Sequence, residues 1–385
     1  MNNGYAVRSA SIVREQRRLG WQPCVVTSPN QQPQPCVDVE EFDDVRYHRI
    51  ANPGPRRRPF LHEIGSVRKL TRRLEKALAT EQPDVIHAHS PSTWAYAALR
   101  VARKYRLPFV YEMRGLWQGD SGNHPFPFKY LAGDMLERYV LRRADALVAI
   151  SNGLRQDLVN RGADEQRLFV VRNGVAEESF QIPARDIELT REFQLNGVVT
   201  LGYLGSLFTR EGLDVLLRAL PSMHGESGFK VVLAGGGAAE SHLRQLAQSL
   251  DLGNRVVFTG RVTRDELPRY YSIMDVLIYP RIRNRTTDTV TPLKPLEAMA
   301  FGKAIVSSDA GGLTELLPAS VCRRFPCGDS AALARCCREL IRDATLRQQL
   351  GRAARAHAEQ HYRWTDVIPL YDTVYATAVT NAERA

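Results

Sequence analysis

The sequence lacks long apolar runs, paired cysteines and low-complexity tracts. Apolar residues make up 44% of its 385 positions, yet no run approaches the ~18 consecutive residues that a membrane-spanning helix needs. The six cysteines show no C-x-x-C spacing and no matched Cys/His cluster, which argues against a zinc site and against a disulfide framework. We therefore expect reduced thiols in a cytoplasmic protein.

The positive charge is unevenly distributed. The net charge is +10, and residues 1–180 hold 27 Lys/Arg against 20 Asp/Glu. The densest basic run is residues 55–78, where apolar residues recur at helical spacing beside Arg68, Lys69 and Arg72. Two interpretations fit: an ordinary solvated helix over a core, or a surface that approaches phosphate or the anionic lipid of the inner membrane face. Aromatic residues do not alternate with the basic ones and no reader motif is present, which argues against nucleic-acid binding.

Both halves alternate short β-branched runs with amphipathic stretches, a pattern typical of parallel sheets flanked by helices. The alternation lapses in residues 177–197. The sequence thus predicts an α/β protein of two Rossmann-like domains, residues 1–182 and 183–363, with a C-terminal helix at 364–385 that joins the first domain. The predicted strands are PCVVTS, VRYHRI, DVIHAH, FVYEM, ALVAIS and LFVVRN in the first half, and VTLGYLG, FKVVLAG, RVVFTG, DVLIYP and KAIVSS in the second.

One expected element is missing. A doubly wound domain begins with a strand, a Gly-rich turn and a helix, and here only the turn NNGY and the helix AVRSASIVREQRRL are present. That first strand usually lies in the centre of the sheet. We therefore expect a gap in the first sheet, and an apolar run of about five residues upstream that would fill it.

The second half contains a candidate phosphate turn between Gly205 and Gly212. The turn follows a predicted strand and precedes a helix, so its backbone amides, with Arg210 beside them, suit a phosphate. An ordinary structural turn explains the same glycines.

The stretch VTPLKPLEAMAFGK is more informative. Pro292 and Pro295 fix a turn into a helix, which leaves the amides of Leu293 and Lys294 without intrahelical partners. Lys294 adds a full positive charge, and Glu297 can accept two hydrogen bonds from a vicinal diol such as a ribose. The alternative is a surface salt bridge between Lys294 and Glu297.

Two strands of the first half end in polar residues. DVIHAH places His87 and His89 on one face, with His89 nearest the carboxyl end where parallel sheets bind ligands. Arg114 follows the next strand and suits a phosphate or an acidic acceptor. A hydrogen-bonded structural histidine and an ion pair of Arg114 with Glu112 or Asp120 are equally compatible with the pattern.

Taken together, these stretches resemble the retaining glycosyltransferases of family 4, which have the GT-B fold of two Rossmann-like domains facing across a cleft. The resemblance covers essentially the whole chain. More narrowly, TREGLD and VTPLKPLEAMA resemble members associated with bacterial exopolysaccharide gene clusters. The motifs that carry the resemblance are NGYAVRSASIVREQRRLGW, PDVIHAHS, ERYVLRRADALVAIS, VRNGV, LGYLGSLFTREGLDVLLRAL, VVFTGRVTRDELPRYYSIMDVLIYP and LEAMAFGKAIVSSDAGGLTELL.

The resemblance implies roles for individual residues. Glu297 matches the second glutamate of the family's E-x7-E signature and would bind the donor ribose, whereas the first glutamate falls on Thr289, with Asp288 the nearby substitute. The family's arginine and lysine on the donor diphosphate fall on Ser206 and Glu211. Arg210 and Lys294 would then supply that charge, and we expect loss of the Glu211 side chain to have little effect.

Further positions follow from the same resemblance. Gly4 matches the loop that approaches the diphosphate, and Arg261 and Val262 match the segment that reads the base. The turn at Thr291, Pro292 and Leu293, together with Gly205, completes the donor site. A histidine that often contacts the donor sugar falls on Arg114, which with His89 is placed on the acceptor side.

The expected activity is transfer of a sugar, with retention, from a nucleotide diphosphate sugar to a saccharide or lipid-linked saccharide. No D-x-D motif follows a strand, which favours a metal-independent enzyme without a cofactor beyond its co-substrate. Two alternatives remain open. A nucleotide-sugar epimerase would convert donor without an acceptor, and a degenerate subunit would bind donor without catalysis, as the residues at Thr289, Ser206 and Glu211 would allow.

Overall fold

The computed structural model describes residues 4–29, 37–50, 59–116, 127–226 and 228–384. Trp117, Asp120 and the first part of the basic run, residues 55–58, lie outside the described residues. The chain divides into a first unit of residues 3–172 and 365–385 and a second unit of residues 173–364. The boundary falls at Arg172–Asn173, whereas the sequence placed it at 182–183.

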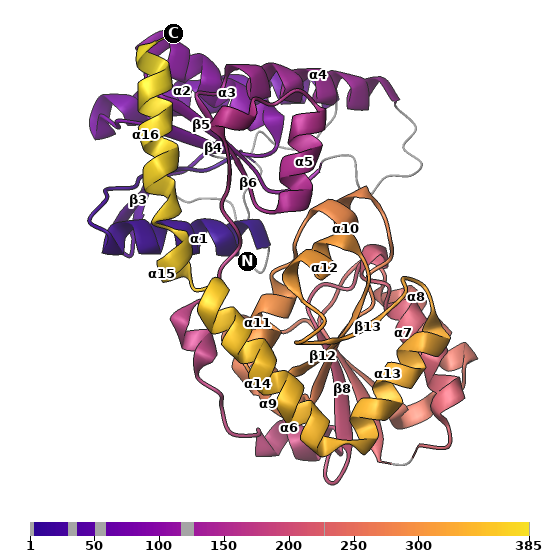
Figure 1. The fold of residues 1–385 in the computed structure, drawn as a ribbon. Helices are drawn as coiled ribbons and strands as arrows, with labels where there is room; N and C mark the ends of the chain where they lie inside the picture. The colour runs from indigo at the N-terminus through magenta and orange to yellow at the C-terminus, as the bar shows by residue number, and fades with distance from the viewer. Residues whose placement is uncertain (1–3, 30–36, 51–58, 117–126, 227, 385) are drawn as a thin grey trace. The chain divides into compact units, whose positions relative to one another are not determined.

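The first unit contains two sheets and the helices that cover them (Figure 1). Strands β4, β5, β6 and β7 form a parallel sheet in that order, and β1, β3 and β2 form a second sheet in which β2 is antiparallel. The elements are α1 (Gly4–Arg18), β1 (Val25–Val26), β2 (Val39–Phe42), β3 (Val45–His48), α2 (Pro59–Glu81), β4 (Ile86–His89), α3 (Ser92–Tyr105), β5 (Phe109–Met113), α4 (Pro127–Arg143), β6 (Ala146–Ala149), α5 (Asn152–Asn160), η1 (Glu165–Arg167), β7 (Leu168–Val170) and α16 (Leu370–Glu383).

The C-terminal region differs from the expected single helix at 364–385. It forms α15 (Trp364–Val367) and then α16, separated at Ile368 and Pro369. Proline has no backbone N–H and its ring clashes with the preceding turn, so a continuous helix through Pro369 is disfavoured. Helix α16 packs against β5 and β6.

The two sheets of the first unit are separate, and each has an edge strand that the sequence placed near the expected first strand. The doubly wound order would place the first strand between β1 and β4. Among the described residues, β1 ends one sheet and β4 ends the other, and the two strands are not hydrogen-bonded to each other. Helix α1 is attached to the β4-β5-β6-β7 sheet by side-chain contacts.

Arg8 supplies much of that attachment. The buried face of α1 is largely polar, and Arg8 on that face is only 2% exposed. Its Nε donates to Glu112 Oε1 of β5 at 2.9 Å, and its two terminal nitrogens donate to the carbonyls of Arg172 (2.8 Å) and Val171 (2.9 Å) beyond β7. A further bond reaches the Tyr371 hydroxyl of α16 at 3.1 Å. One side chain thus joins the first helix, the sheet and the last helix.

The second unit is a continuous six-stranded parallel sheet in the order β10-β9-β8-β11-β12-β13. This is the doubly wound order, with the first strand, β8, in the centre. Its elements are η2 (Glu177–Phe180), α6 (Ile187–Glu192), β8 (Val199–Leu204), η3 (Thr209–Glu211), α7 (Leu213–Ala219), η4 (Leu220–Met223), β9 (Phe229–Ala234), α8 (Glu240–Ser249), η5 (Gly253–Arg255), β10 (Val256–Gly260), α9 (Leu267–Ile273), β11 (Val276–Tyr279), α10 (Arg285–Thr289), α11 (Lys294–Ala300), β12 (Ala304–Ser308), α12 (Gly311–Leu316), β13 (Arg323–Phe325), α13 (Ser330–Arg342) and α14 (Ala344–His361), and the unit ends at Trp364, the first residue of α15.

The composition of these strands explains their position. Strands β9, β11 and β12 are nearly continuous apolar runs and are buried along their length, as expected for parallel strands covered on both faces. Because all six strands run in the same direction, their carboxyl ends meet at one edge, where the loops that follow them gather. None of the helices in the described parts of the chain has an apolar stretch of the length that crossing a membrane requires.

We predict that Arg8→Ala lowers the free energy of unfolding of the first unit by about 3–5 kcal/mol, because it leaves the buried carboxylate of Glu112 without this partner. The matched control is Arg17→Ala on the same helix, whose pair with Asp44 is solvent-exposed and should contribute about 0–1 kcal/mol. Urea denaturation followed by tryptophan fluorescence measures both. Equal losses in the two variants would contradict the role of Arg8.

Candidate active site

The exits of β8 and β9 cross closely at the carboxyl edge of the second sheet. Gly205 and Gly235 have φ angles of +143° and +141°, which side chains rarely adopt. A Cβ on Gly235 would lie 1.9 Å from the Gly205 carbonyl oxygen, and a Cβ on Gly205 would lie 2.3 Å from Cε of Lys294. Because these two residues have no side chain, the two loops and the Lys294 side chain can pack closely against one another.

Glu211 lies at the centre of a cluster of cations. It ends η3 and is 2% exposed. Its carboxylate lies 3.2 Å from Arg281 Nη2, 3.3 Å from Lys294 Nζ and 3.6 Å from Arg210 Nε. Burial alone would raise the pKa of Glu211, but Lys294, then Arg281 and Arg210, lower it to about 2. The carboxylate is thus ionised, and the four side chains together carry a formal net charge of +2.

Lys294 is the first residue of α11, and its backbone and side chain are both held in place. Its carbonyl accepts a hydrogen bond from the Tyr279 hydroxyl at 3.1 Å. Its ammonium donates to the Tyr203 hydroxyl and pairs with Glu211, and its side chain stays 22% exposed. Burial lowers the pKa of Lys294, and the carboxylate of Glu211 opposes part of that change. Lys294 thus combines a fixed position with access to solvent.

Glu297 pairs differently from the salt bridge that the sequence left open. The carboxylate partner of Lys294 is Glu211, whereas Glu297 Oε2 accepts a hydrogen bond from the Tyr271 hydroxyl at 3.0 Å. Tyr271 is itself oriented by stacking on Phe301, with ring centroids 4.6 Å apart. Burial raises the pKa of Glu297 and outweighs the opposing effects of Tyr271, Arg264 and Lys294. The carboxylate retains oxygen lone pairs for hydroxyl donors.

The turn before α11 is held to the start of the second unit. Thr291 is buried and its carbonyl accepts a hydrogen bond from Asn173 Nδ2 at 3.2 Å. Pro292 is half-buried, and the carbonyl of the half-buried Leu293 accepts from the amides of Leu296 and Glu297. The predicted donor turn therefore has a fixed backbone next to Lys294.

Asp288 and Thr289 end α10 at the same edge. Asp288 Oδ1 accepts the Gly311 amide N–H at 2.8 Å, which caps α12, and lies 3.7 Å from Arg283. Thr289 Oγ1 donates to the Arg285 carbonyl at 2.7 Å. Asp288 thus has a structural partner, and its side chain is 32% exposed.

Ser206, Arg261 and Val262 complete the predicted donor residues. The Ser206 carbonyl accepts a hydrogen bond from the Tyr203 hydroxyl at 2.9 Å. Arg261 is exposed and Val262 is half-buried directly after β10. A Cβ on Gly236 would lie 2.9 Å from Cγ of Arg261, so the exits of β9 and β10 are close here.

Sequence reasoning missed three residues of this cluster: Arg281, Tyr203 and Tyr271. Arg281 follows β11 by two positions and is 8% exposed. A signal for it existed, because a cation directly after a buried parallel strand lies at the ligand-binding edge. The tyrosines gave no such signal, since aromatic residues within strands and helices usually fill the core.

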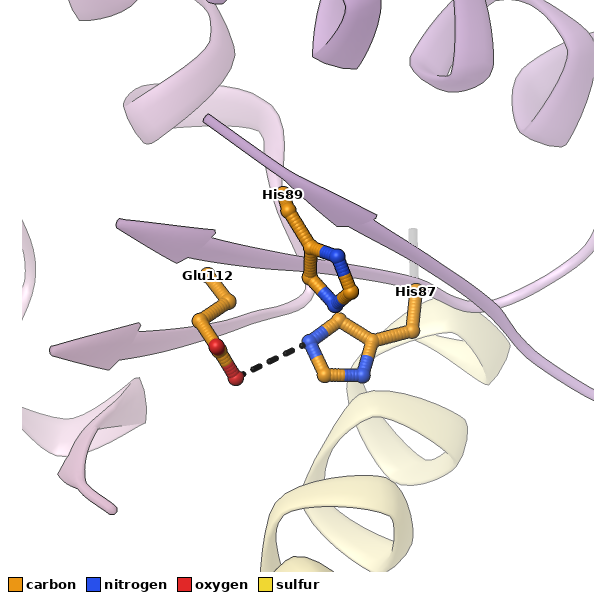
Figure 2. A group of neighbouring side chains, drawn as sticks. All are labelled: His87, His89 and Glu112. Carbon is orange, nitrogen blue, oxygen red and sulfur yellow. Dashed lines mark ion pairs between the residues drawn. The ribbon is translucent and has the colours of Figure 1, made fainter. Parts of the chain in front are cut away.

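In the first unit, His87, His89 and Glu112 converge from β4 and β5, with ligand atoms within 4.8 Å of one another (Figure 2). The dashed contact joins His87 Nε2 to Glu112 Oε2 at 3.4 Å. Three such side chains can hold a metal ion. However, both Arg8 and Arg114 pair with the same carboxylate, and their charges disfavour a further cation.

Arg114 and His89 are fixed by one another and by α1. Arg114 Nη2 lies 2.9 Å from His89 Nε2, and Nη1 donates to Ser9 Oγ at 2.6 Å and to the Tyr5 carbonyl at 3.2 Å. Burial, followed by the charge of Arg114, lowers the pKa of His89 well below its usual value, so the imidazole is neutral. Arg114 Nε also pairs with Glu112 Oε1 at 2.5 Å, so the structural ion pair with Glu112 that the sequence left open is formed. Gly4 is exposed at the start of α1.

Comparison with known proteins agrees with this architecture. The "Glycosyl transferase 4-like domain" family matches residues 3–174, and the "Glycosyl transferases group 1" family matches residues 189–357. Sulfoquinovosyl transferase SQD2 of Arabidopsis thaliana is 26% identical over 94% of this chain and 68% of its own length. A GDP-mannose-dependent alpha-mannosyltransferase of Mycobacterium tuberculosis is 25% identical over 82% of this chain and 78% of its own.

Solved structures show the same fold at low identity. Sucrose-phosphate synthase from Thermosynechococcus elongatus superimposes with a TM-score of 0.80 at 18% identity, covering 97% of this chain and 93% of that one. Anabaena HepE in complex with UDP and glucose gives a TM-score of 0.74 at 17% identity, covering 98% and 96%. With a family match on each unit and this fold, the chain belongs to the family 4-like glycosyltransferases of the GT-B type.

Proposed function

We propose that this glycosyltransferase is a retaining, metal-independent enzyme. It would move a sugar from a nucleotide diphosphate sugar to a saccharide or lipid-linked saccharide in exopolysaccharide or cell-surface glycan synthesis. The observation that supports it best is the cation cluster around Glu211. Arg210, Arg281 and Lys294 leave a net charge of +2 at the edge where parallel sheets bind ligands, and that charge complements a diphosphate.

The proposed chemistry needs stabilisation of the departing diphosphate. Charges that are already in position act on a developing anion without reorganisation, which makes such contacts among the largest contributions to catalysis. Lys294 and Arg210, which are 22% and 29% exposed, would contact the diphosphate. Glu297 would accept hydrogen bonds from the donor ribose. The acceptor proton would pass to a departing phosphate oxygen, so no protein base is required.

His89 and Arg114 belong to the acceptor side in this proposal. Their mutual contact and the contacts of Arg114 with α1 hold them rigidly. We therefore assign them a structural role on the acceptor side. They would fix the carboxyl ends of β4 and β5, and they would not exchange protons with the acceptor hydroxyl.

A lipid-linked acceptor would require contact with a membrane surface. On α2, Arg68, Lys69, Arg72 and Lys76 are exposed along one face, while Leu70 is buried beneath it. Helix α3 contacts both α2 and α4. On α4, three apolar side chains one turn apart are also exposed, namely Leu131 (60%), Met135 (63%) and Tyr139 (40%). Exposed basic residues on α2 and exposed apolar residues on α4 would together suit an anionic bilayer surface.

The donor class is tested by a thermal-shift screen of the full chain with UDP-, GDP-, ADP- and TDP-sugars, because a ligand that binds the native state raises the melting temperature. Two of the similar proteins carry GDP-mannose or UDP in their descriptions, so both bases belong in the screen. Proton NMR of the product then reads the anomeric configuration, and addition of EDTA tests metal independence. An inverted product, or loss of turnover in EDTA, would overturn the corresponding part of the proposal.

We predict that Glu297→Ala abolishes the donor-induced thermal shift with only a small change in the melting temperature of the free protein. The side chain is polar and only half-buried, so its truncation removes little packing from the apolar core. Glu339→Ala, which removes an exposed pair with Arg323 in the same unit, should retain the shift. A large loss of stability in Glu297→Ala with donor affinity unchanged would contradict the assignment.

Arg210→Ala and Lys294→Ala should each lower kcat by about 10²-fold or more, the scale for losing one preorganised group at a developing anion. The control is Arg244→Ala, an exposed cation paired with Glu240, which should turn over at the rate of the unchanged protein. Steady-state transfer assays at saturating donor distinguish the three variants. If kcat is maintained in both Arg210→Ala and Lys294→Ala, the charge assignment is wrong.

The protein should sediment with vesicles that contain anionic lipid and dissociate as salt rises, because each basic residue near such a surface contributes about 1 kcal/mol and salt screens it. Combined alanine substitution of Arg68, Lys69 and Arg72 should abolish most of this binding. Removing the same charge at Arg244, Arg323 and Arg342 of the second unit is the control. Equal sedimentation with neutral vesicles would count against the surface.

A further inference from the structure

The position of Glu211 reverses the expectation that its loss has little effect. Its side chain is 3% exposed, so a bound ligand has almost no access to it. Any influence on the reaction must therefore act through the three cations that surround it. Replacing the carboxylate with an uncharged group would leave those cations without their shared counter-charge.

The ammonium of Lys294 depends on this carboxylate and on Gly205. Lys294 comes from α11, 83 positions after Glu211, and its Cε passes 2.3 Å from where a Cβ on Gly205 would be. Tyr203 and Glu211 are acceptors for two of its three N–H donors among the described residues. The remaining donor and the partial exposure of the side chain leave Lys294 able to bind an anion.

We propose that Glu211 is a positioning residue: with Gly205 providing the space, it holds the Lys294 ammonium where the leaving diphosphate of the donor develops its charge. This inference rests on the proposed function. In the related family, a lysine at the position of Glu211 is expected to contact the diphosphate. Here Glu211 and Lys294 would perform that task together. Arg281, whose Nη2 lies 3.2 Å from Glu211 Oε1, helps to keep the carboxylate ionised and oriented.

A purely structural ion cluster is the alternative, and the first unit shows what one looks like. There Glu112 is paired with Arg8 and Arg114, which are 2% and 5% exposed and donate to several other groups. In the second unit, Lys294 and Arg210 keep 22% and 29% of their side-chain surface exposed. That exposure leaves Lys294 and Arg210 accessible to a ligand, whereas the buried arginines of the first unit are not.

The proposal has a consequence for pH dependence. Loss of Glu211 removes the group that favours the protonated amine, while burial, Arg281 and Arg210 still disfavour it. The pKa of Lys294 therefore falls further, and turnover should decline at lower pH on the alkaline side. The charged and titratable groups that face Lys294 are Tyr203 of β8, Arg210 and Glu211 of η3, Tyr271 of α9, Tyr279 of β11, Arg281 after it, and Glu297 of α11.

The test compares pH profiles of kcat for the unchanged protein, Glu211→Gln, Lys294→Arg and the double variant. Glu211→Gln should lower kcat by up to about 10²-fold, as a displaced catalytic group does. It should also lower the pH at which kcat declines on the alkaline side of the profile, the alkaline limb, by about one pH unit or more. Arginine stays charged at all these pH values. In the Lys294→Arg background, Glu211→Gln should therefore leave the alkaline limb of the kcat profile where it is. An unmoved limb in the lysine background, or an equal movement in both, would overturn the proposal.

Two further measurements separate this outcome from misfolding and from failure of the proposed function. Glu137→Gln removes a buried carboxylate that pairs with Arg161 in the first unit at 2.7 Å, and it should lose stability without moving the limb. Trace labelling of Lys294 with acetic anhydride, read by peptide mass spectrometry, follows its titration without an activity assay. Glu211→Asp substitutes for Glu211→Gln if the latter does not fold, and its Lys294 should titrate at lower pH than in the unchanged chain.

An unchanged labelling midpoint in Glu211→Gln or Glu211→Asp overturns the role of Glu211. If the unchanged protein transfers no sugar, the proposed function fails, and the positioning role fails with it even where the amine titration moves. If the unchanged protein is active and both Glu211 variants retain its kcat and its pH profile, the positioning role alone is wrong.

Discussion

The ionised carboxylate of Glu211 lets three cations lie together at the carboxyl edge of the second sheet. Without an anion at that point, Arg210, Arg281 and Lys294 would repel one another at short range. With it, the cluster keeps a net positive charge and a fixed geometry. Gly205 and Gly235 also maintain this geometry, because a side chain at either position would displace Lys294 or separate the ends of β8 and β9.

The first unit uses similar chemistry for a different purpose. Glu112 is buried at the end of β5 and joins Arg8 of α1, Arg114 and Tyr371 of α16. Burial would raise the pKa of Glu112, but Arg114 and Arg8 hold it well below its usual range. Because the arginines are buried and donate to several groups, this cluster binds helices from both ends of the chain to the sheet. Through Arg8 it attaches α1 to β5.

The fold was largely predictable because its signals are local. Runs such as FKVVLAG and DVLIYP predicted β9 and β11 directly, and those predictions are confirmed. The edge strands β2 and β13 were missed: β2 is exposed along its length and β13 is short, so neither shows the buried apolar run that identified the others. The break at Pro369 was also missed, although a proline inside a helical pattern is a known signal.

The candidate site was less predictable because its contacts join distant positions. Local spacing placed Lys294 one turn from Glu297 and left a salt bridge between them open, yet the partner of Lys294 is Glu211, from another loop. In the same way, no local pattern showed that Arg114 would bond His89 and Ser9 at once. Single residues can be nominated from a strand's carboxyl end, but their pairing depends on which strands become neighbours.

The central claim is that the carboxyl edge of the second unit binds a nucleoside diphosphate through the cluster around Glu211. Hydrogen–deuterium exchange of the full chain, with and without each of UDP, GDP, ADP and TDP, tests it most directly. At least one nucleotide should slow exchange in residues 205–211 and 288–297. Protection confined to other segments, or none at saturating concentrations of all four, would contradict it.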